Sequence, residues 1–147
     1  MAMARMVDIS KKEDVPRRAV ASGEIVLARD SIQAIHARKV PKGDPIHTAE
    51  VAGLQAIKKV WEALPHCHPI PITSAAVEFN VRGNRIAVTC EVTATYKTGV
   101  EMEALYGCTV ALLTIWDMVK SLEKDGEGQY PLTRIQNVRV VTKEKGT

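Results

Sequence analysis

Three groups of side chains capable of acid–base or ligand chemistry stand out along this chain of 147 residues. His66-Cys67-His68-Pro69 follows one apolar helical pattern, and Lys97-Thr98-Gly99-Val100-Glu101-Met102-Glu103 opens a second, longer one. Asp117 and Lys120 interrupt the far end of that second pattern. A charged group in apolar surroundings costs several kcal/mol unless it is paired or used. These positions are therefore the candidates for a catalytic or binding site.

Asp117 and Lys120 are three residues apart and so share one face of a helix. An ordinary surface ion pair at these positions would be worth little free energy and would be functionally silent. The apolar residues around the pair favour another interpretation, in which a desolvated lysine beside a carboxylate acts as an acid or base. Glu103 lies 14 positions upstream, or roughly 21 Å along a helix. Either the ligand is long, or two subunits contribute opposite helix ends to one site.

The segment His66-Cys67-His68 has three interpretations: a metal site, an anion site, or a simple plug between a helix and a strand. A zinc site needs several ligands, commonly from two spaced pairs, and no second pair lies nearby in the sequence. The sequence therefore predicts no metal site. Prolines at positions 65, 69 and 71 stiffen the loop. A stiff loop that presents imidazole and backbone N–H groups favours an anion over a plug.

The elements that position these residues follow from hydrophobic periodicity and from helix breakers. Residues 1–18 are polar, with Pro16 as a breaker, and are expected to form a loose arm ahead of one domain, 19–147. Helices are expected over 31–38, 48–63 and 100–122, the first two capped by Asp30 or Ser31 and by Thr48. Strands are expected over 75–82, 86–96 and 135–142, with a short apolar run at 24–29 that begins a strand or a helix.

The order of these elements predicts an α+β fold. Gly83-Asn84 forms a two-residue hairpin turn between two strands whose apolar residues alternate. A helix, two strands, a second helix and a final strand, preceded by an early strand, is typical of a ferredoxin-like two-layer sandwich. We therefore expect an antiparallel sheet with helices on one face.

Composition limits the classes of function. A count of 20 basic against 17 acidic residues gives a net charge of +3, too weak for a general nucleic-acid surface but sufficient for one anion site. Three cysteines (Cys67, Cys90 and Cys108) form no disulfide framework, which favours a cytoplasmic protein. No stretch of membrane-spanning length is free of charge. The helix over 100–122 is apolar on nearly every side, more than one sheet covers, which predicts a homo-oligomer.

Five segments together resemble the cyclic pyranopterin monophosphate synthase family (molybdenum cofactor biosynthesis protein C). They stand in the family's order and span almost the whole chain: Met6-Val7-Asp8-Ile9-Ser10, Lys42-Gly43-Asp44, Pro65-His66-Cys67-His68-Pro69, residues 97–105 and residues 114–120. The resemblance implies a lyase of the phosphorus–oxygen type. Its reaction converts 3′,8-cyclo-7,8-dihydroguanosine 5′-triphosphate to cyclic pyranopterin monophosphate and pyrophosphate. The resemblance also implies a hexamer, built as a trimer of dimers, with active sites at subunit interfaces.

The same resemblance assigns roles by position. Asp117 is implied as the catalytic acid–base residue, Lys120 as its proton donor, and Lys42 as a further catalytic or phosphate-binding lysine. A second set is implied to bind substrate: Arg17, His66, Cys67, His68, Lys97, Glu101, Met102 and Glu103. His66 stands where the family usually has Leu. The family's usual Lys-x-Gly-Gly-Lys-Ser tail is here Lys143-Glu144-Lys145-Gly146-Thr147, which is either a shortened tail or one that relies on its two lysines.

The implied substrate also sets the expected cofactors and partners. A triphosphate carries about four negative charges, which lysine, arginine and histidine side chains at an interface can neutralise. No redox cofactor is needed, and Mg²⁺ is expected at most as a companion of the triphosphate. The expected partners are a small nucleotide-derived substrate and further copies of the chain, with no nucleic acid and no membrane.

Two alternatives lack catalysis. A ferredoxin-like RNA-binding module is disfavoured because Phe79 and Tyr96 fall on the apolar faces of their strands. A non-catalytic nucleotide-binding regulatory module is harder to exclude by composition. The Asp117–Lys120 pair in an apolar helix is the feature that favours an enzyme over it.

Overall fold

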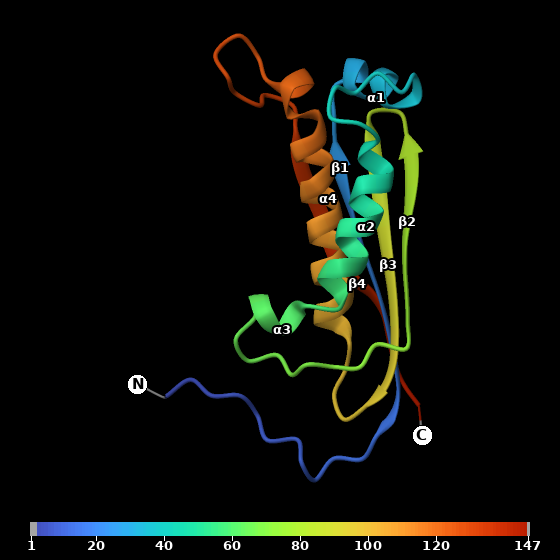
Figure 1. The fold of residues 1–147 in the computed structure, drawn as a ribbon, viewed down its shortest axis with the longest axis vertical. Helices are drawn as coiled ribbons and strands as arrows, with labels where there is room; N and C mark the ends of the chain where they lie inside the picture. The colour runs from blue at the N-terminus through green and yellow to red at the C-terminus, as the bar shows by residue number, and fades with distance from the viewer. Residues whose placement is uncertain (1–2, 147) are drawn as a thin grey trace.

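A computed structural model describes residues 3–146, so the first two residues of the predicted arm and the last residue of the predicted domain lie outside the described residues. Within that range one antiparallel sheet has the strand order β2-β3-β1-β4, and helices pack on one of its faces (Figure 1). The strands are β1 (Val15–Val26), β2 (Ser74–Arg82), β3 (Arg85–Tyr96) and β4 (Arg134–Lys145). The helices are α1 (Arg29–His36), α2 (Pro45–Ile57), the short α3 (Val60–Ala63) and α4 (Glu101–Glu123). This architecture confirms the predicted ferredoxin-like α+β fold.

Strand β1 begins at Val15, inside the segment that the sequence predicts as a loose arm, so residues 15–18 belong to the sheet. It pairs with β3 along its whole length and with β4 on its other edge. Helix α4 lies close to this strand, so several of the buried residues of β1 are alanine or glycine. These small residues give the strand a weak hydrophobic pattern in the sequence. A Cβ at Gly23 would lie 2.9 Å from Leu112 Cδ1 and 2.8 Å from Val138 Cγ2, closer than such atoms normally approach.

Helix α2 starts before the predicted cap. Asp44 Oδ1 accepts hydrogen bonds from the backbone N–H groups of Ile46 (3.0 Å) and His47 (3.2 Å), and Pro45 takes the first helical position. Thr48, the predicted cap, instead donates its hydroxyl to the Asp44 carbonyl at 2.9 Å. Asp followed by Pro is a strong start signal. The predicted helix over 48–63 is thus two helices, since α2 ends at Ile57 and α3 follows after a turn.

The start of helix α1 also differs from the predicted one. It begins at Arg29, and its N-cap residue Ala28 provides no side-chain cap. Asp30, the first predicted cap, lies within the first turn. Ser31, the alternative cap, is fully buried and donates its hydroxyl to Glu123 at the end of α4. The side chain that sequence spacing assigns to a local cap therefore makes a tertiary contact.

Helix α4 contributes much of the core and lies beside α2 on one face of the sheet (Figure 1). A Cβ at Gly53 would lie 3.2 Å from the Gly107 carbonyl, so the two glycines let α2 and α4 pack closely. α2 therefore covers a side of α4 that the sequence analysis leaves for another subunit. The large apolar residues of α4 that remain exposed are Met102, Leu113 and Leu122.

By length and apolarity α4 could cross a membrane, the one helix of residues 3–146 that could. Half of its most apolar stretch is buried inside this domain. That placement is typical of the core helix of a globular fold.

Candidate active site

The predicted site residues form two groups at opposite ends of α4 (Figure 1). The first group lies where the β3–α4 loop, the 64–73 loop and the start of β1 meet, and consists of Arg17, His66, Cys67, His68, Lys97, Glu101, Met102 and Glu103. The second group lies toward the end of α4 and consists of Lys42, Asp117 and Lys120. Positions 103 and 117 are roughly 21 Å apart along the helix. One chain therefore does not bring the two groups together.

Asp117 is at the centre of the second group. Its Oδ1 accepts a hydrogen bond from Lys42 Nζ at 3.2 Å and lies 3.1 Å from Lys120 Nζ. Lys42 also donates to the backbone carbonyl of Asp117 at 3.0 Å. The hydrogen bond from Lys120, followed by that from Lys42, lowers the pKa of Asp117 below its ordinary value. The carboxylate is therefore ionised at neutral pH with two ammonium groups beside it.

The dry surroundings predicted for Asp117 and Lys120 are wrong for the single chain. The side chains of Lys42, Asp117 and Lys120 are between 43 and 57% exposed. Asp117 and Lys120 lie on the face of α4 that points away from the sheet and α2, as does the exposed Leu113 one turn earlier. The apolar neighbours in the sequence instead face the core, where Met118 and Val119 are buried.

Lys42 reaches α4 from a tight turn between α1 and α2. The backbone N–H of Gly43 donates to the carbonyl of Val40 at 3.1 Å, and Val40 is buried in the core. Gly43 has φ of +115°, a left-handed conformation that favours glycine. Its Cβ position lies 4.0 Å from Met118 Cε, so the turn rests directly on α4. The structure thus places Lys42 beside Asp117 and at the far end of α4 from His68.

Arg17 is the buried cation of the first group. Its side chain is on the helix side of β1, and the residue is only 7% exposed. The guanidinium donates to the carbonyls of Tyr96 (3.4 Å) and Lys97 (3.3 Å). Within residues 3–146 it makes no ion pair with a carboxylate. A buried guanidinium without a carboxylate partner is suited to an anionic ligand.

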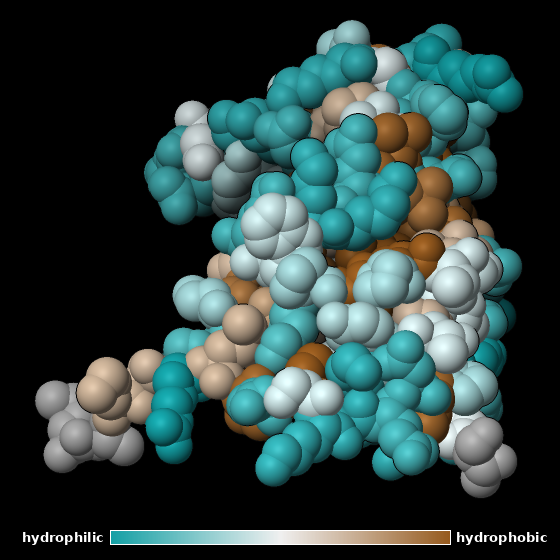
Figure 2. All heavy atoms as spheres, turned by 60° about the horizontal axis from the view of Figure 1, so that its bottom comes forward, coloured by the Kyte–Doolittle hydropathy of each residue, from teal (hydrophilic) through white to brown (hydrophobic). Residues whose placement is uncertain are grey.

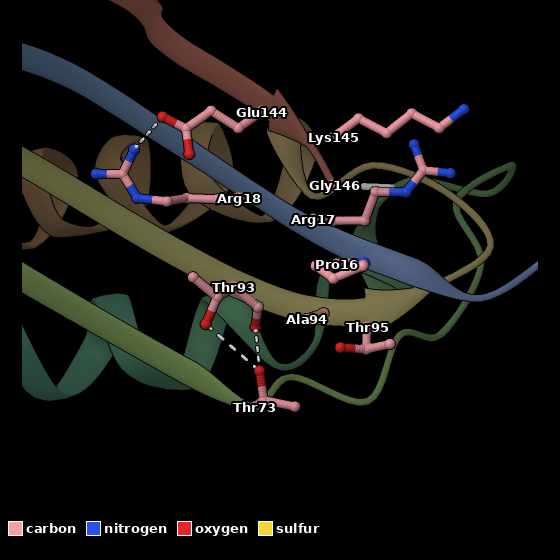
Figure 3. A pocket seen from close by; sticks show the side chains of 10 residues that line it. All are labelled: Pro16, Arg17, Arg18, Thr73, Thr93, Ala94, Thr95, Glu144, Lys145 and Gly146. Atoms are coloured by element: carbon pink, nitrogen blue, oxygen red, sulfur yellow. Dashed lines mark hydrogen bonds and ion pairs between the residues drawn. The ribbon is translucent and has the colours of Figure 1, made fainter.

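A cavity of about 410 Å³ opens at the same end of the sheet (Figure 3). Arg18 is neutralised there by Glu91 (2.9 Å) and Glu144 (3.2 Å). Arg17 and Lys145 are Cα partners across β1 and β4, and both side chains extend toward the end of the sheet in Figure 3. The positive charge at this end therefore comes from Arg17 and Lys145 rather than from Arg18.

Burial raises the pKa values of two acidic side chains in the first group, Glu103 and Cys67. Glu103 is 4% exposed, and burial, together with the nearby Glu101 carboxylate, raises its pKa to about 7. Burial, followed by the charge of Glu103, raises the pKa of the Cys67 thiol. At neutral pH the thiol is therefore protonated, whereas Glu103 is divided between its two forms and can donate or accept a proton.

Glu101 folds back over Gly99, and its Oε1 occupies the space that a Cβ at position 99 would need. This oxygen is buried and accepts no hydrogen bond from residues 3–146, although Lys143 Nζ lies 3.5 Å away. The Lys143 contact is close enough for an ion pair but lacks hydrogen-bond geometry, so the oxygen keeps its capacity to accept. Lys143, from the variant tail, thus adds a cation to the first group.

The N-terminal segment contacts two residues of the first group. His68 Nε2 donates to the carbonyl of Val7 at 2.8 Å, which places a proton on that nitrogen. Lys97 Nζ donates to the carbonyl of Lys12 at 3.1 Å and lies 3.2 Å from Asp14 Oδ1. Toward its start the segment projects away from the body (Figure 2). Residues 7–14 therefore lie beside the first group, a contact that the sequence analysis did not foresee.

Metal ligands do not gather at either group. Within residues 3–146 there is no cluster of His, Cys, Asp and Glu that could hold a metal ion. His66 is exposed and Cys67 is half-buried, while Cys90 and Cys108 are buried in the core. The described residues thus give the His66-Cys67-His68 segment no further metal ligands.

Comparison with known proteins assigns the family. Residues 6–146 match the MoaC family. This chain belongs to that family. A protein of Thermococcus onnurineus named probable cyclic pyranopterin monophosphate synthase is 55% identical over 141 residues, which cover 96% of this chain and 90% of the relative. A protein of Archaeoglobus fulgidus with the same name is 56% identical over 142 residues, covering 97% and 91%. The family resemblance predicted from the five segments is confirmed.

One relative carries a different name. A protein of Methanothermobacter thermautotrophicus is named probable cyclic pyranopterin monophosphate synthase accessory protein. It is 52% identical over 141 residues, which cover 96% of this MoaC-family chain and 89% of the relative.

Two kinds of residue around the site escaped the sequence analysis of this MoaC-family chain. Asp44 caps the start of α2, two residues after Lys42. An Asp followed by Pro is a helix-start signal, so this cap could have been predicted from the sequence. Glu123 makes buried contacts with residues 90 or more positions away, Ala28 and Ser31, and no local pattern reports them.

Proposed function

We propose that this MoaC-family protein is a cyclic pyranopterin monophosphate synthase acting in molybdenum cofactor biosynthesis. Its substrate is 3′,8-cyclo-7,8-dihydroguanosine 5′-triphosphate, and its products are cyclic pyranopterin monophosphate and pyrophosphate, a phosphorus–oxygen lyase reaction. Relatives of this name match nearly the whole chain. The observation that carries the proposal is the hydrogen-bonded group of Lys42, Asp117 and Lys120.

The second group has the chemistry that the rearrangement needs. Opening a purine ring and rebuilding it as a pterin requires protons to move on and off nitrogen atoms. Asp117 is an ionised carboxylate that can accept a proton, and Lys120 is an ammonium that can donate one. Lys42 donates both to the Asp117 carboxylate and to the backbone carbonyl of the same residue, which holds the carboxylate in place. The three residues thus form an acid–base set, two of them on one face of α4 and the third from the turn that rests on it.

The first group has the chemistry of an anion site. Arg17 is a buried cation, while Lys97 and His68 now donate to main-chain carbonyls that phosphate oxygens can replace. Neutralising charge on a departing pyrophosphate favours closure of the cyclic phosphate. Glu103, with its pKa of about 7, is the residue of this group suited to exchange a proton with the ligand.

A working site needs both groups, and we propose that two subunits of a homo-oligomer supply them. The spacing of roughly 21 Å along α4 separates the groups within one chain. Large exposed apolar residues occur on two neighbouring elements, Leu113 on α4 and Val138, Val140 and Val141 on β4. Such surfaces are typical of interfaces between subunits. A hexamer, built as a trimer of dimers, is the assembly we propose.

The proposed reaction requires no protein-bound cofactor. We expect lysine, arginine and histidine side chains to neutralise the triphosphate, and Mg²⁺ to enter with the substrate rather than as a resident ion. We place the protein in the cytoplasm, where nucleotide-derived substrates are made and where its three cysteines remain free thiols.

The test is turnover of the proposed substrate. The protein is incubated with 3′,8-cyclo-7,8-dihydroguanosine 5′-triphosphate, and the product is detected by pterin fluorescence after oxidation, together with released pyrophosphate. We expect turnover by the wild type and a loss of at least about 10²-fold in Lys120→Ala. Lys124→Ala, an exposed lysine one turn further on, is the matched control and should keep wild-type turnover. Binding of the substrate without product formation would overturn the proposal.

A further inference from the structure

Glu123, the last residue of α4, is a buried carboxylate whose partners are all neutral donors. The residue is 7% exposed. Its two oxygens accept from the backbone N–H of Ala28 at 3.1 and 3.0 Å, from the hydroxyl of Thr133 at 2.6 Å, and from the hydroxyl of Ser31. A buried carboxylate is stable only when its hydrogen bonds are satisfied. These donors therefore fix the end of α4 to the start of α1 and to the segment before β4.

The contact with Ala28 replaces a helix cap that α1 lacks. Ala28 is the N-cap residue of α1 and has no side chain that can cap it. In a capping box, a glutamate at the third helical position accepts a hydrogen bond from the N–H of the N-cap residue. The third position of α1 is Ser31, and Glu123 of α4 takes the place of that glutamate. Its negative charge at the start of α1 is also favoured by the helix dipole.

The anchored helix leads directly to Lys42. α1 ends at His36, and the turn that carries Lys42 rests on Met118 of α4. Asp117 lies six residues before Glu123 on the same helix, so both contacts use the same end of α4. The position of Lys42 relative to Asp117 thus depends on how α1 is held.

We propose that Glu123 is a positioning residue: by capping α1 from α4, it holds the Lys42 turn against Asp117 and Lys120. The expected effect of Glu123 on turnover rests on the proposed function. Its expected effect on the distance between Lys42 and Asp117 does not. Glu123 touches no reacting atom in this scheme and acts only through Lys42.

The first test measures the pKa of Asp117 by NMR in protein labelled with ¹³C at the aspartate carboxyl carbons, with Asp117→Asn to assign the signal. In Glu123→Gln, we expect the pKa of Asp117 to rise, because Lys42 moves away from it. Removing the negative charge of Glu123 would by itself lower this pKa, so the direction separates repositioning from direct electrostatics. Val77→Ala, a core change on β2, is the control for general destabilisation and should leave the pKa in place. An unchanged or lowered pKa in Glu123→Gln would overturn the proposal.

Ser31→Ala gives a second route if Glu123→Gln does not fold. It removes one donor to Glu123 and keeps the carboxylate. We expect a smaller rise of the Asp117 pKa in the same direction. No rise in this folded variant would count against the proposal in the same way.

The second test is a double-mutant cycle on turnover. Glu123→Gln should lower turnover roughly 10-fold in the wild-type background, because misplacement of a catalytic group is costly. In the Lys42→Ala background the same change should cost less than about 2-fold, since the residue it positions is gone. Equal losses in both backgrounds would show that Glu123 acts by another route. If no form turns over the substrate, the proposed function fails while the Asp117 pKa still decides this inference.

Discussion

Glu103→Gln replaces a buried, titrating carboxyl by a neutral amide of similar shape. Burial raises the pKa of Glu103 from 4.5 to about 7, and each unit of pKa difference between folded and unfolded chains is worth about 1.4 kcal/mol. The fold therefore favours the neutral form of Glu103 by about 3 kcal/mol relative to the unfolded chain. The glutamine side chain stays neutral at every pH, so titration at position 103 does not change the stability of the variant.

The sign of the pH dependence follows from proton binding. Between pH 4.5 and about 7 the folded chain holds a proton on Glu103 that the unfolded chain has lost. The stability contributed by the neutral carboxyl is full below pH 4.5 and is lost as the pH rises through about 7. We expect Glu103→Gln to match the wild type near pH 4.5 and to exceed it by about 3 kcal/mol in free energy of unfolding at pH 8.

Denaturant unfolding at both pH values measures this difference. The subunit concentration must be held constant, because association adds to the apparent stability. Glu127→Gln, an exposed residue in the loop before β4, is the control and should follow the wild type at both pH values. The reasoning is refuted if Glu103→Gln is no more stable than the wild type at pH 8.

Three further predictions concern the two groups and the assembly. Asp117→Asn should fold normally, because Asp117 is exposed, yet lose at least about 10²-fold in turnover. A lower melting temperature with normal turnover would instead show that the Lys42–Asp117–Lys120 group is structural. His68→Ala should weaken pyrophosphate binding by about 1.5 to 3 kcal/mol, the cost of one charged hydrogen bond; unchanged affinity in calorimetry would remove His68 from the anion site. Light scattering at micromolar concentration should report an oligomer larger than a dimer, and a monomer would exclude the shared site.

The regular elements could be predicted wherever their own residues carry the pattern. Strict alternation on either side of Gly83-Asn84 predicted β2 and β3 to within a residue or so of their observed bounds. The apolar run of α4 likewise predicted its ends to within one residue. Strand β1 was missed except for its last three residues, because alanine and glycine beneath α4 give little hydrophobic signal.

Features that depend on packing between distant segments could not be read from the sequence. The exposure of Asp117 depends on which side of α4 is covered by α2. The pairing of Lys42 with Asp117 joins positions 75 residues apart, and that of Glu123 with Ala28 joins positions 95 apart. Local spacing identified Asp117 and Lys120 as neighbours but gave no account of Lys42 beside them.

The central claim is that each site joins the first group of one subunit to the second group of another. His68→Ala protein, whose anion site is weakened, and inactive Lys120→Ala protein are dissociated, mixed and reassembled, with mixing verified by native mass spectrometry. Activity is measured at a substrate concentration too low for His68→Ala alone to turn over measurably. The account predicts recovery of activity, because at random mixing about a quarter of the sites combine an intact first group with an intact second group.

The matched control mixes Lys42→Ala with Lys120→Ala. Both lysines contact Asp117 of their own chain, so every site retains one defect and no activity should return. Recovery in the His68→Ala and Lys120→Ala mixture, with none in the control, is the predicted result. No recovery in verified mixed oligomers, or recovery in the control, would contradict the account.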